Sequence, residues 1–249
     1  VQIYDRAGGA VTDLGTARAL NGVDTTPRTR GETLPTCSAT NVYFCSSVAE
    51  GSSWKTSILR FPLPGGAPVA PTAPASGGGG IAVADGDFPA ATDDGVLFAA
   101  ASAPGGALDT VCRLTEGGGG PSTLFSISSP GGTWAVSGLW AASDRRVVAV
   151  TSPSDGGAFL GVWKEPEQAP SLWLSTISPS VVASLNDTWL VWGSGSQGDG
   201  SEMYAMNWEE EVPRLLGLAP GYSRPVLAPG GSTVLIPGND GTRPTSWTV

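Results

Sequence analysis

The chain has 249 residues, 40% of them hydrophobic and 14% charged, which is enough apolar surface to bury a large core. Its net charge of −9 disfavours binding to the phosphate backbone of nucleic acids and to anionic membrane surfaces, so we expect neither partner. No apolar run approaches the ~18 residues that a membrane-spanning helix needs, so we also expect no membrane span.

The sequence contains no histidine. Within this chain, that absence excludes Ser-His-Asp and Cys-His nucleophile systems, and zinc or iron sites with histidine ligands. Carboxylate chemistry and oxygen-ligated Ca²⁺ stay open. Because no convergent catalytic or cofactor motif accompanies the carboxylates, we assign no catalytic residue and expect no cofactor and no metal site.

The N-terminal segment has a strand–turn–strand pattern over residues 1–16, VQIYDRAGGAVTDLGT. Residues 16–31 then form a long connection, and we expect no amphipathic helix longer than a turn or two. The chain begins at Val1 rather than Met, from which we expect a mature or excised segment.

Two cysteines, Cys37 and Cys45, flank two predicted strands that are joined by a turn at residues 38–41. Residues so placed can lie nearly opposite each other in a hairpin, so we predict a disulfide, with two buried thiols as the alternative. Cys112 is then an unpaired core residue. A disulfide, few lysines and abundant Ser, Thr and Gly favour an exported protein that is secreted, periplasmic or on the cell surface.

Five short apolar runs, each rich in β-branched or aromatic residues, recur along the chain at spacings of 54, 51, 42 and 45 residues. The first four are each followed by a second hairpin pattern, an apolar strand, a polar or Gly-rich turn and another short strand. The runs are residues 42–47, 96–101, 147–152, 189–194 and 234–239, and the hairpin patterns are residues 58–72, 111–126, 160–175 and 203–218.

An innermost strand also precedes each run, at residues 32–39, 81–87, 134–143, 177–187 and 224–231. The fifth run has no hairpin after it, whereas the N-terminal segment is such a hairpin. We therefore predict one all-β domain over residues 1–249, a five-bladed β-propeller in which the N- and C-terminal strands close one blade. Six blades are the alternative if one repeat is degenerate.

The phrases SILRFPLPGGAPV (residues 57–69) and GYSRPVLAPGGSTVLIPG (residues 221–238) resemble blades of TolB-like and other extracellular bacterial propellers. The resemblance to this propeller superfamily covers the whole chain. It implies a fold and no specific catalytic residue, because the superfamily includes scaffolds, lectins and glycosidases.

The candidate ligand-binding residues are Arg28, Arg30, Trp54 and Trp134. The predicted topology places them on the face where the central channel opens, in the 16–31 connection and in loops between strands. Arg offers fork-shaped donors for carboxylates or sulfates, and an exposed Trp ring stacks on sugar faces. The alternative is that Trp134 belongs to the core and the arginines are solvated.

These residues favour an exported, non-catalytic propeller that binds a protein or glycan partner on its channel face. One alternative is a carboxylate-dependent glycoside hydrolase, for which Asp5, Asp85 and Asp144 are the candidates. Another is a structural surface protein or assembly subunit, which large apolar side patches would indicate. The oligomeric state stays open.

Overall fold

A computed structural model describes residues 2–4, 11–13, 36–38, 40–50, 53–62, 81–103, 106–116, 119–127, 134–143, 145–153, 158–165, 168–176, 181–194, 200–219, 225–228, 230–236 and 245–249. Within these ranges every regular element is a β-strand. This part of the chain also holds no helix with the length and apolarity needed to cross a membrane. The all-β prediction is therefore confirmed.

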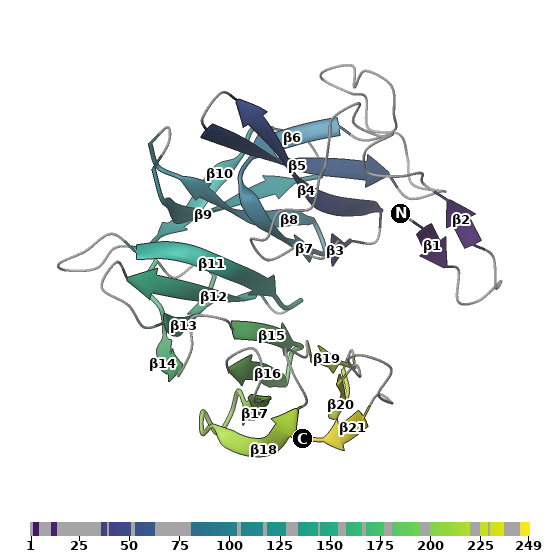
Figure 1. Cartoon of the computed structure of the whole chain (residues 1–249), viewed down its shortest axis with the longest axis vertical. Helices are drawn as coiled ribbons and strands as arrows, with labels where there is room; N and C mark the ends of the chain where they lie inside the picture. The colour runs from purple at the N-terminus through teal and green to yellow at the C-terminus, as the bar shows by residue number, and fades with distance from the viewer. Residues whose placement is uncertain are drawn as a thin grey trace. The chain divides into compact units, whose positions relative to one another are not determined.

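Four antiparallel sheets of four strands follow one another along the chain, and we number them blades 1 to 4 (Figure 1). Blade 1 consists of β3 (Thr36–Cys37), β4 (Asn41–Glu50), β5 (Ser53–Pro62) and β6 (Ile81–Asp85), and blade 2 consists of β7 (Asp87–Thr92), β8 (Gly95–Ala101), β9 (Leu108–Thr115) and β10 (Ser122–Ser126). Blade 3 consists of β11 (Trp134–Ala141), β12 (Arg146–Pro153), β13 (Ala158–Lys164) and β14 (Leu172–Thr176). Blade 4 consists of β15 (Val181–Leu185), β16 (Trp189–Ser194), β17 (Ser201–Asn207) and β18 (Arg214–Ala219).

Two smaller sheets complete the described strands. The N-terminal hairpin pairs β1 (Gln2–Tyr4) with β2 (Val11–Asp13). Blade 5 has the order β19 (Val226–Leu227), β20 (Thr233–Ile236) and β21 (Thr245–Thr248), so three strands of this blade lie in the described part of the chain. The chain divides into two compact units, residues 1–98 with 114–121 and residues 99–113 with 122–249. Ring closure by the two ends, the number of blades and a single domain over 1–249 stay predictions.

The assignment of one predicted strand was wrong. The stretch at residues 81–87 was expected to open blade 2, but β6 pairs with β5, with Asp85 opposite Ser57, and so completes blade 1. A single residue, Gly86, then separates β6 from β7, and its N–H donates to the carbonyl of Thr56. Hydrophobic periodicity does not resolve two short strands divided by one residue, which explains the error.

The predicted disulfide between Cys37 and Cys45 is also absent. The hairpin with its turn at residues 38–41 is confirmed, but its register places Cys37 opposite Val42 and Cys45 opposite Ile58. Cys45 lies three residues beyond Val42, about 10 Å along the strand, which exceeds the Cα separation that a disulfide allows. Instead, the Cys45 thiol contacts Asp87 Oδ1 at 3.0 Å. Cys112 is buried and makes no disulfide, as predicted.

The apolar core of residues 99–113 and 122–249 lies between successive blades. One cluster joins the facing sides of blades 3 and 4, and a second joins blades 4 and 5. Trp192 belongs to the first cluster, whereas Trp189 packs against the second. The two indoles therefore point to opposite faces of the sheet, as residues three apart on one strand do.

Candidate functional site

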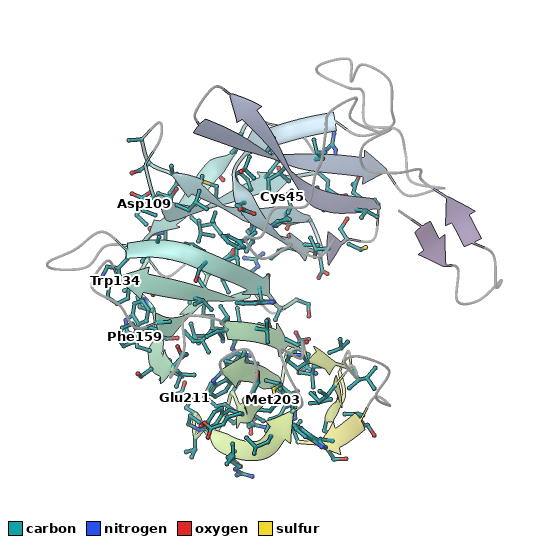
Figure 2. The ribbon with its side chains drawn as sticks, viewed as in Figure 1. Cys45, Asp109, Trp134, Phe159, Met203 and Glu211 are labelled. Atoms are coloured by element: carbon teal, nitrogen blue, oxygen red, sulfur yellow. The ribbon has the colours of Figure 1, made fainter. Side chains whose placement is uncertain are left out.

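An aromatic cluster lies on the face of blade 3 opposite to the blade 4 interface. Trp134 begins β11 and stacks on Phe159 of β13, with ring centroids 5.4 Å apart and planes 23° apart. The edge of Trp173 of β14 meets the Trp134 ring at a centroid distance of 5.3 Å. Figure 2 shows Trp134 and Phe159 beside each other in blade 3. We call Trp134, Phe159 and Trp173 the aromatic cluster.

The aromatic cluster rests on a buried aromatic base. Trp173 also meets Trp163 edge to face at 5.5 Å, and Trp163 in turn stacks on Phe125 at 4.5 Å with the planes 9° apart. Trp163 and Phe125 are both 1% exposed. Because both base rings are held in the core, the rings above them are held in one arrangement rather than left mobile on the surface.

A glycine makes this stacking possible. Gly161 lies directly opposite Trp173 in the β13–β14 pair. A Cβ at position 161 would lie 2.4 Å from the Trp163 ring and 2.8 Å from the Trp173 ring. Only a residue without a side chain therefore lets the two indoles meet across the strand, so Gly161 fixes the position of Trp173.

The aromatic cluster is only partly covered. Trp173 is 41% exposed, among the most exposed large apolar side chains that the structure describes, and Trp134 and Phe159 are half-buried. Exposed Ser175 shares the side of β14 that carries Trp173. Exposed Ser171 directly precedes the strand, and its hydroxyl group donates to the carbonyl of Val162 at 3.2 Å. The cluster thus combines flat apolar rings with neighbouring hydroxyl groups.

A groove of about 280 Å³ borders β14 where it meets blade 4. Four consecutive residues of β14 line one side, and residues of β16, β17 and the β17–β18 turn line the other. The lining residues are Trp173, Leu174, Ser175, Thr176, Trp192, Tyr204 and Pro213. Trp192 and Tyr204 stack there with their centroids 5.5 Å apart.

Of the sequence-predicted binding residues, the structure brings Trp134 into the aromatic cluster with Phe159 and Trp173. Trp54 lies in β5, where its backbone pairs with Ala49, and its side chain is outside the described part of the chain. Arg28 and Arg30 lie outside the described residues, so their role stays a prediction. Trp173 and Phe159, which lie within apolar strands, were not among the predicted binding residues.

The carboxylates considered for glycoside hydrolysis are largely outside the described part of the chain. Asp5 and Asp144 lie outside the described residues, and of Asp85 only the backbone is described, at the end of β6. Several described carboxylates hold turns. Asp109 accepts from the Ser102 hydroxyl at 2.6 Å, and Asp187 accepts from the Ser143 hydroxyl at 2.5 Å.

A polar cluster surrounds Glu116 at the end of β9. Its carboxylate accepts hydrogen bonds from the hydroxyl groups of Ser38, at 2.5 Å, Thr40, and Tyr43, at 3.1 Å. Burial alone would raise the pKa of Glu116, but these hydrogen bonds outweigh it and lower that pKa below its ordinary value. Burial and the adjacent Glu116 raise the pKa of Tyr43. Every partner belongs to the β3–β4 hairpin, so the cluster holds that turn in place.

The lowered pKa of Glu116 predicts a specific pH dependence. A carboxylate whose pKa is depressed by folding adds stability above its unfolded pKa, and that stability is lost as the pH falls through the folded pKa. We expect Glu116→Gln to lower the free energy of unfolding by about 1.5 kcal/mol at pH 7, and the difference from the parent to shrink towards pH 3. Urea unfolding at a series of pH values measures this difference. Glu209→Gln, at an exposed turn, is the control; an unchanged difference at pH 3 would contradict the assignment.

No protein-family model and no curated protein sequence matches the chain. Among solved structures, acylaminoacyl peptidase from Pyrococcus horikoshii is 9% identical and aligns over 82% of this chain and 34% of its own, with a TM-score of 0.56. The β-propeller domain of the Trilobed protease from Pyrococcus furiosus is 8% identical over 81% of this chain and 61% of its own, with a TM-score of 0.53. An oligogalacturonate lyase in complex with manganese is 9% identical over 85% of this chain and 63% of its own, with a TM-score of 0.56.

These likenesses confirm the predicted propeller fold. At such low identities they concern the fold alone. This chain also spans only about a third of the length of the acylaminoacyl peptidase and less than two thirds of the other two proteins. Function must therefore be argued from the site.

Proposed function

We propose that this β-propeller is an exported, non-catalytic binding module that holds a glycan on the aromatic cluster of blade 3. The observation that carries the proposal is the exposed indole of Trp173, held on edge by Trp134 and Phe159 and flanked by exposed hydroxyl groups. With the disulfide absent, export rests on the composition of the chain, with few lysines and many small polar residues.

A sugar ring matches this surface for two physical reasons. Its axial C–H groups form an apolar face that packs on an indole, and its hydroxyl groups exchange hydrogen bonds with Ser171 and Ser175 at the edge. The buried base below the aromatic cluster fixes Trp173 before a ligand arrives, which lowers the entropy lost on binding. The three rings and the two flanking serines carry no charge, which suits a neutral glycan.

The hydrogen bonds and the ion pair that the described carboxylates form support a binding role rather than glycoside hydrolysis. Glycoside hydrolysis needs two carboxyl groups about 5–10 Å apart on either side of the bond. Asp109, Asp187 and Glu116 each hold a turn through serine or threonine hydroxyl groups, and Glu165 forms an ion pair with Arg113. One fold neighbour acts, by its name, on oligogalacturonate, and others are peptidases by name, but that likeness concerns the fold.

The proposal predicts a selective loss of glycan binding. A glycan array with the purified chain should identify a bound sugar, and calorimetry should then measure its affinity. Removing an indole from the contact takes away an apolar face worth about 1–2 kcal/mol, so we expect Trp173→Ala and Trp134→Ala to weaken binding about tenfold or more.

The matched control is Leu235→Ala on blade 5, because Leu235 is 44% exposed and Trp173 is 41% exposed. This control variant should bind like the parent. Equal affinities for the parent and both tryptophan variants would remove the aromatic cluster as the site. Turnover of the bound sugar would replace the binding role with an enzymatic one.

A further inference from the structure

We propose a second binding site, in the groove between β14 and blade 4, that takes an extended peptide segment of a partner protein with basic side chains among apolar ones. The site shares Trp173 and Ser175 of β14 with the glycan site, but it adds the blade 4 wall of the groove and does not use Trp134 or Phe159. The juxtaposition that supports it is an apolar wall, a single carboxylate within that wall, and the outermost strand of a sheet alongside.

The wall is one face of blade 4. Trp192 pairs with Tyr204 across β16–β17, and Tyr204 pairs with Leu215 across β17–β18, so these three side chains share that face. Their exposure increases outwards, from 4% for Trp192 to 59% for Leu215. A register shift in β18 brings Leu218, 69% exposed, to the same face opposite Glu202. Leaving these leucines in water is unfavourable, so the face is suited to being covered.

The charge on this face is negative. Glu202 Oε2 accepts a hydrogen bond from the Tyr204 hydroxyl at 2.6 Å, which fixes the carboxylate beside the stacked rings. The exposed glutamates at 209–211 lie just before Pro213 on the groove rim, and Arg214 at this end forms an ion pair with Glu210. With the chain at −9 overall, a basic side chain on the partner is the complementary charge.

The opposite border supplies a backbone template. β14 is the last strand in the order β11–β12–β13–β14, and its residues 173–176 line the groove in succession. Every second residue of such a strand directs its N–H and C=O groups away from the sheet. An extended peptide can pair with them as a fifth strand, and its alternate side chains then point into the groove. The ligand is therefore an extended peptide that pairs with β14, places apolar side chains against the wall and directs one basic side chain to Glu202.

The probe is a synthetic peptide of alternating Leu and Arg residues, measured by fluorescence polarisation against the full chain. The matched probes are the same peptide with Glu in place of Arg, and a version with N-methyl groups on alternate backbone nitrogens. We expect the basic peptide to bind, with an affinity that falls as salt rises, and both matched probes to bind at least tenfold more weakly.

Variants locate the site. We expect Glu202→Gln to weaken the basic peptide about tenfold, whereas Asp93→Asn, which removes one exposed charge elsewhere, leaves binding unchanged. Leu218→Arg changes a side chain that is already 69% exposed, so the variant should fold and should repel the peptide.

Equal binding of the basic and acidic peptides, or no effect of either groove variant, would overturn the proposal. So would a dimer in light scattering that Leu218→Arg dissociates, because a second copy would then occupy the groove. Loss of glycan binding in Trp134→Ala with peptide binding retained would separate the two sites.

Discussion

We expect Asn186→Ala to lower the free energy of unfolding by about 3 kcal/mol, which corresponds to a fall in Tm of roughly 6–12 °C for a chain of this size. Asn186 is 8% exposed and uses its whole amide. Its Nδ2 donates to the carbonyls of Ala228 and Gly231, each at 2.9 Å, and so ties the β15–β16 turn of blade 4 to blade 5. Its Oδ1 accepts from the N–H groups of Thr188 and Trp189, at 2.9 and 2.8 Å.

Alanine at position 186 would leave these buried donors and acceptors without the amide, and each unsatisfied group costs about 1–3 kcal/mol before relaxation. Thermal unfolding followed by circular dichroism measures the loss. The matched control is Asn207→Ala, because the Asn207 side chain accepts a hydrogen bond from Glu209 N within an exposed turn rather than between two blades. A fall in Tm for Asn186→Ala no larger than for Asn207→Ala would contradict the assigned role.

We expect Gly95→Ala to be similarly destabilising, at about 3 kcal/mol, the upper end of overpacking costs. Gly95 begins β8 and is buried, and a Cβ there would lie 2.1 Å from the Leu114 carbonyl oxygen and 3.0 Å from the Thr115 Cα. Both obstacles are backbone atoms of the neighbouring strand β9, so no side-chain rotation relieves the clash. The strands must separate locally, which weakens the pairing that forms blade 2.

Gly120→Ala is the control for Gly95→Ala. Gly120 is exposed and a Cβ there meets nothing within 4 Å, so we expect a change within about 0.5 kcal/mol. Urea unfolding of both variants gives the comparison. Equal stability of the two variants would show that β8 and β9 tolerate the additional methyl group and that the close approach is not a constraint.

The fold could be predicted from the sequence to the extent that local periodicity defines strands. The first four apolar runs lie within β4, β8, β12 and β16, and the fifth begins in β20 and ends outside the described residues. The hairpin patterns after the second, third and fourth runs correspond to β9–β10, β13–β14 and β17–β18. The terminal segment TSWTV contains β21, which pairs with β20. The failures concern pairing. The partner of β6 and the register that separates Cys37 from Cys45 depend on which strands meet, and spacing along the chain does not specify that.

The same reason limited prediction of the site. Trp134 was found because it stands at the start of a strand beside a connection, where propellers present ligand-binding groups. Trp173 was not predicted as a binding residue because it lies within an apolar strand, and its exposure follows from its place in the outermost strand of blade 3. Its contact with Trp134 depends on the absence of a side chain at Gly161 in the adjacent strand. Likewise, the pairing register of β16, β17 and β18 decides which side chains of blade 4 share the groove face, and the sequence does not specify that register.

A titration with the sugar that the glycan array identifies, followed by ¹H–¹⁵N NMR, tests the glycan proposal most directly. Each of the nine tryptophans gives one indole N–H signal, and the tryptophans are spread along the whole chain, so the signals that shift locate the site. With assignments from single Trp→Phe variants, we predict that the Trp134 and Trp173 signals shift on addition of sugar. Those of Trp189 and Trp247, which pack against the blade 4–blade 5 core, should stay in place. Shifts at Trp189 or Trp247 with Trp134 and Trp173 unchanged would contradict a glycan site on blade 3.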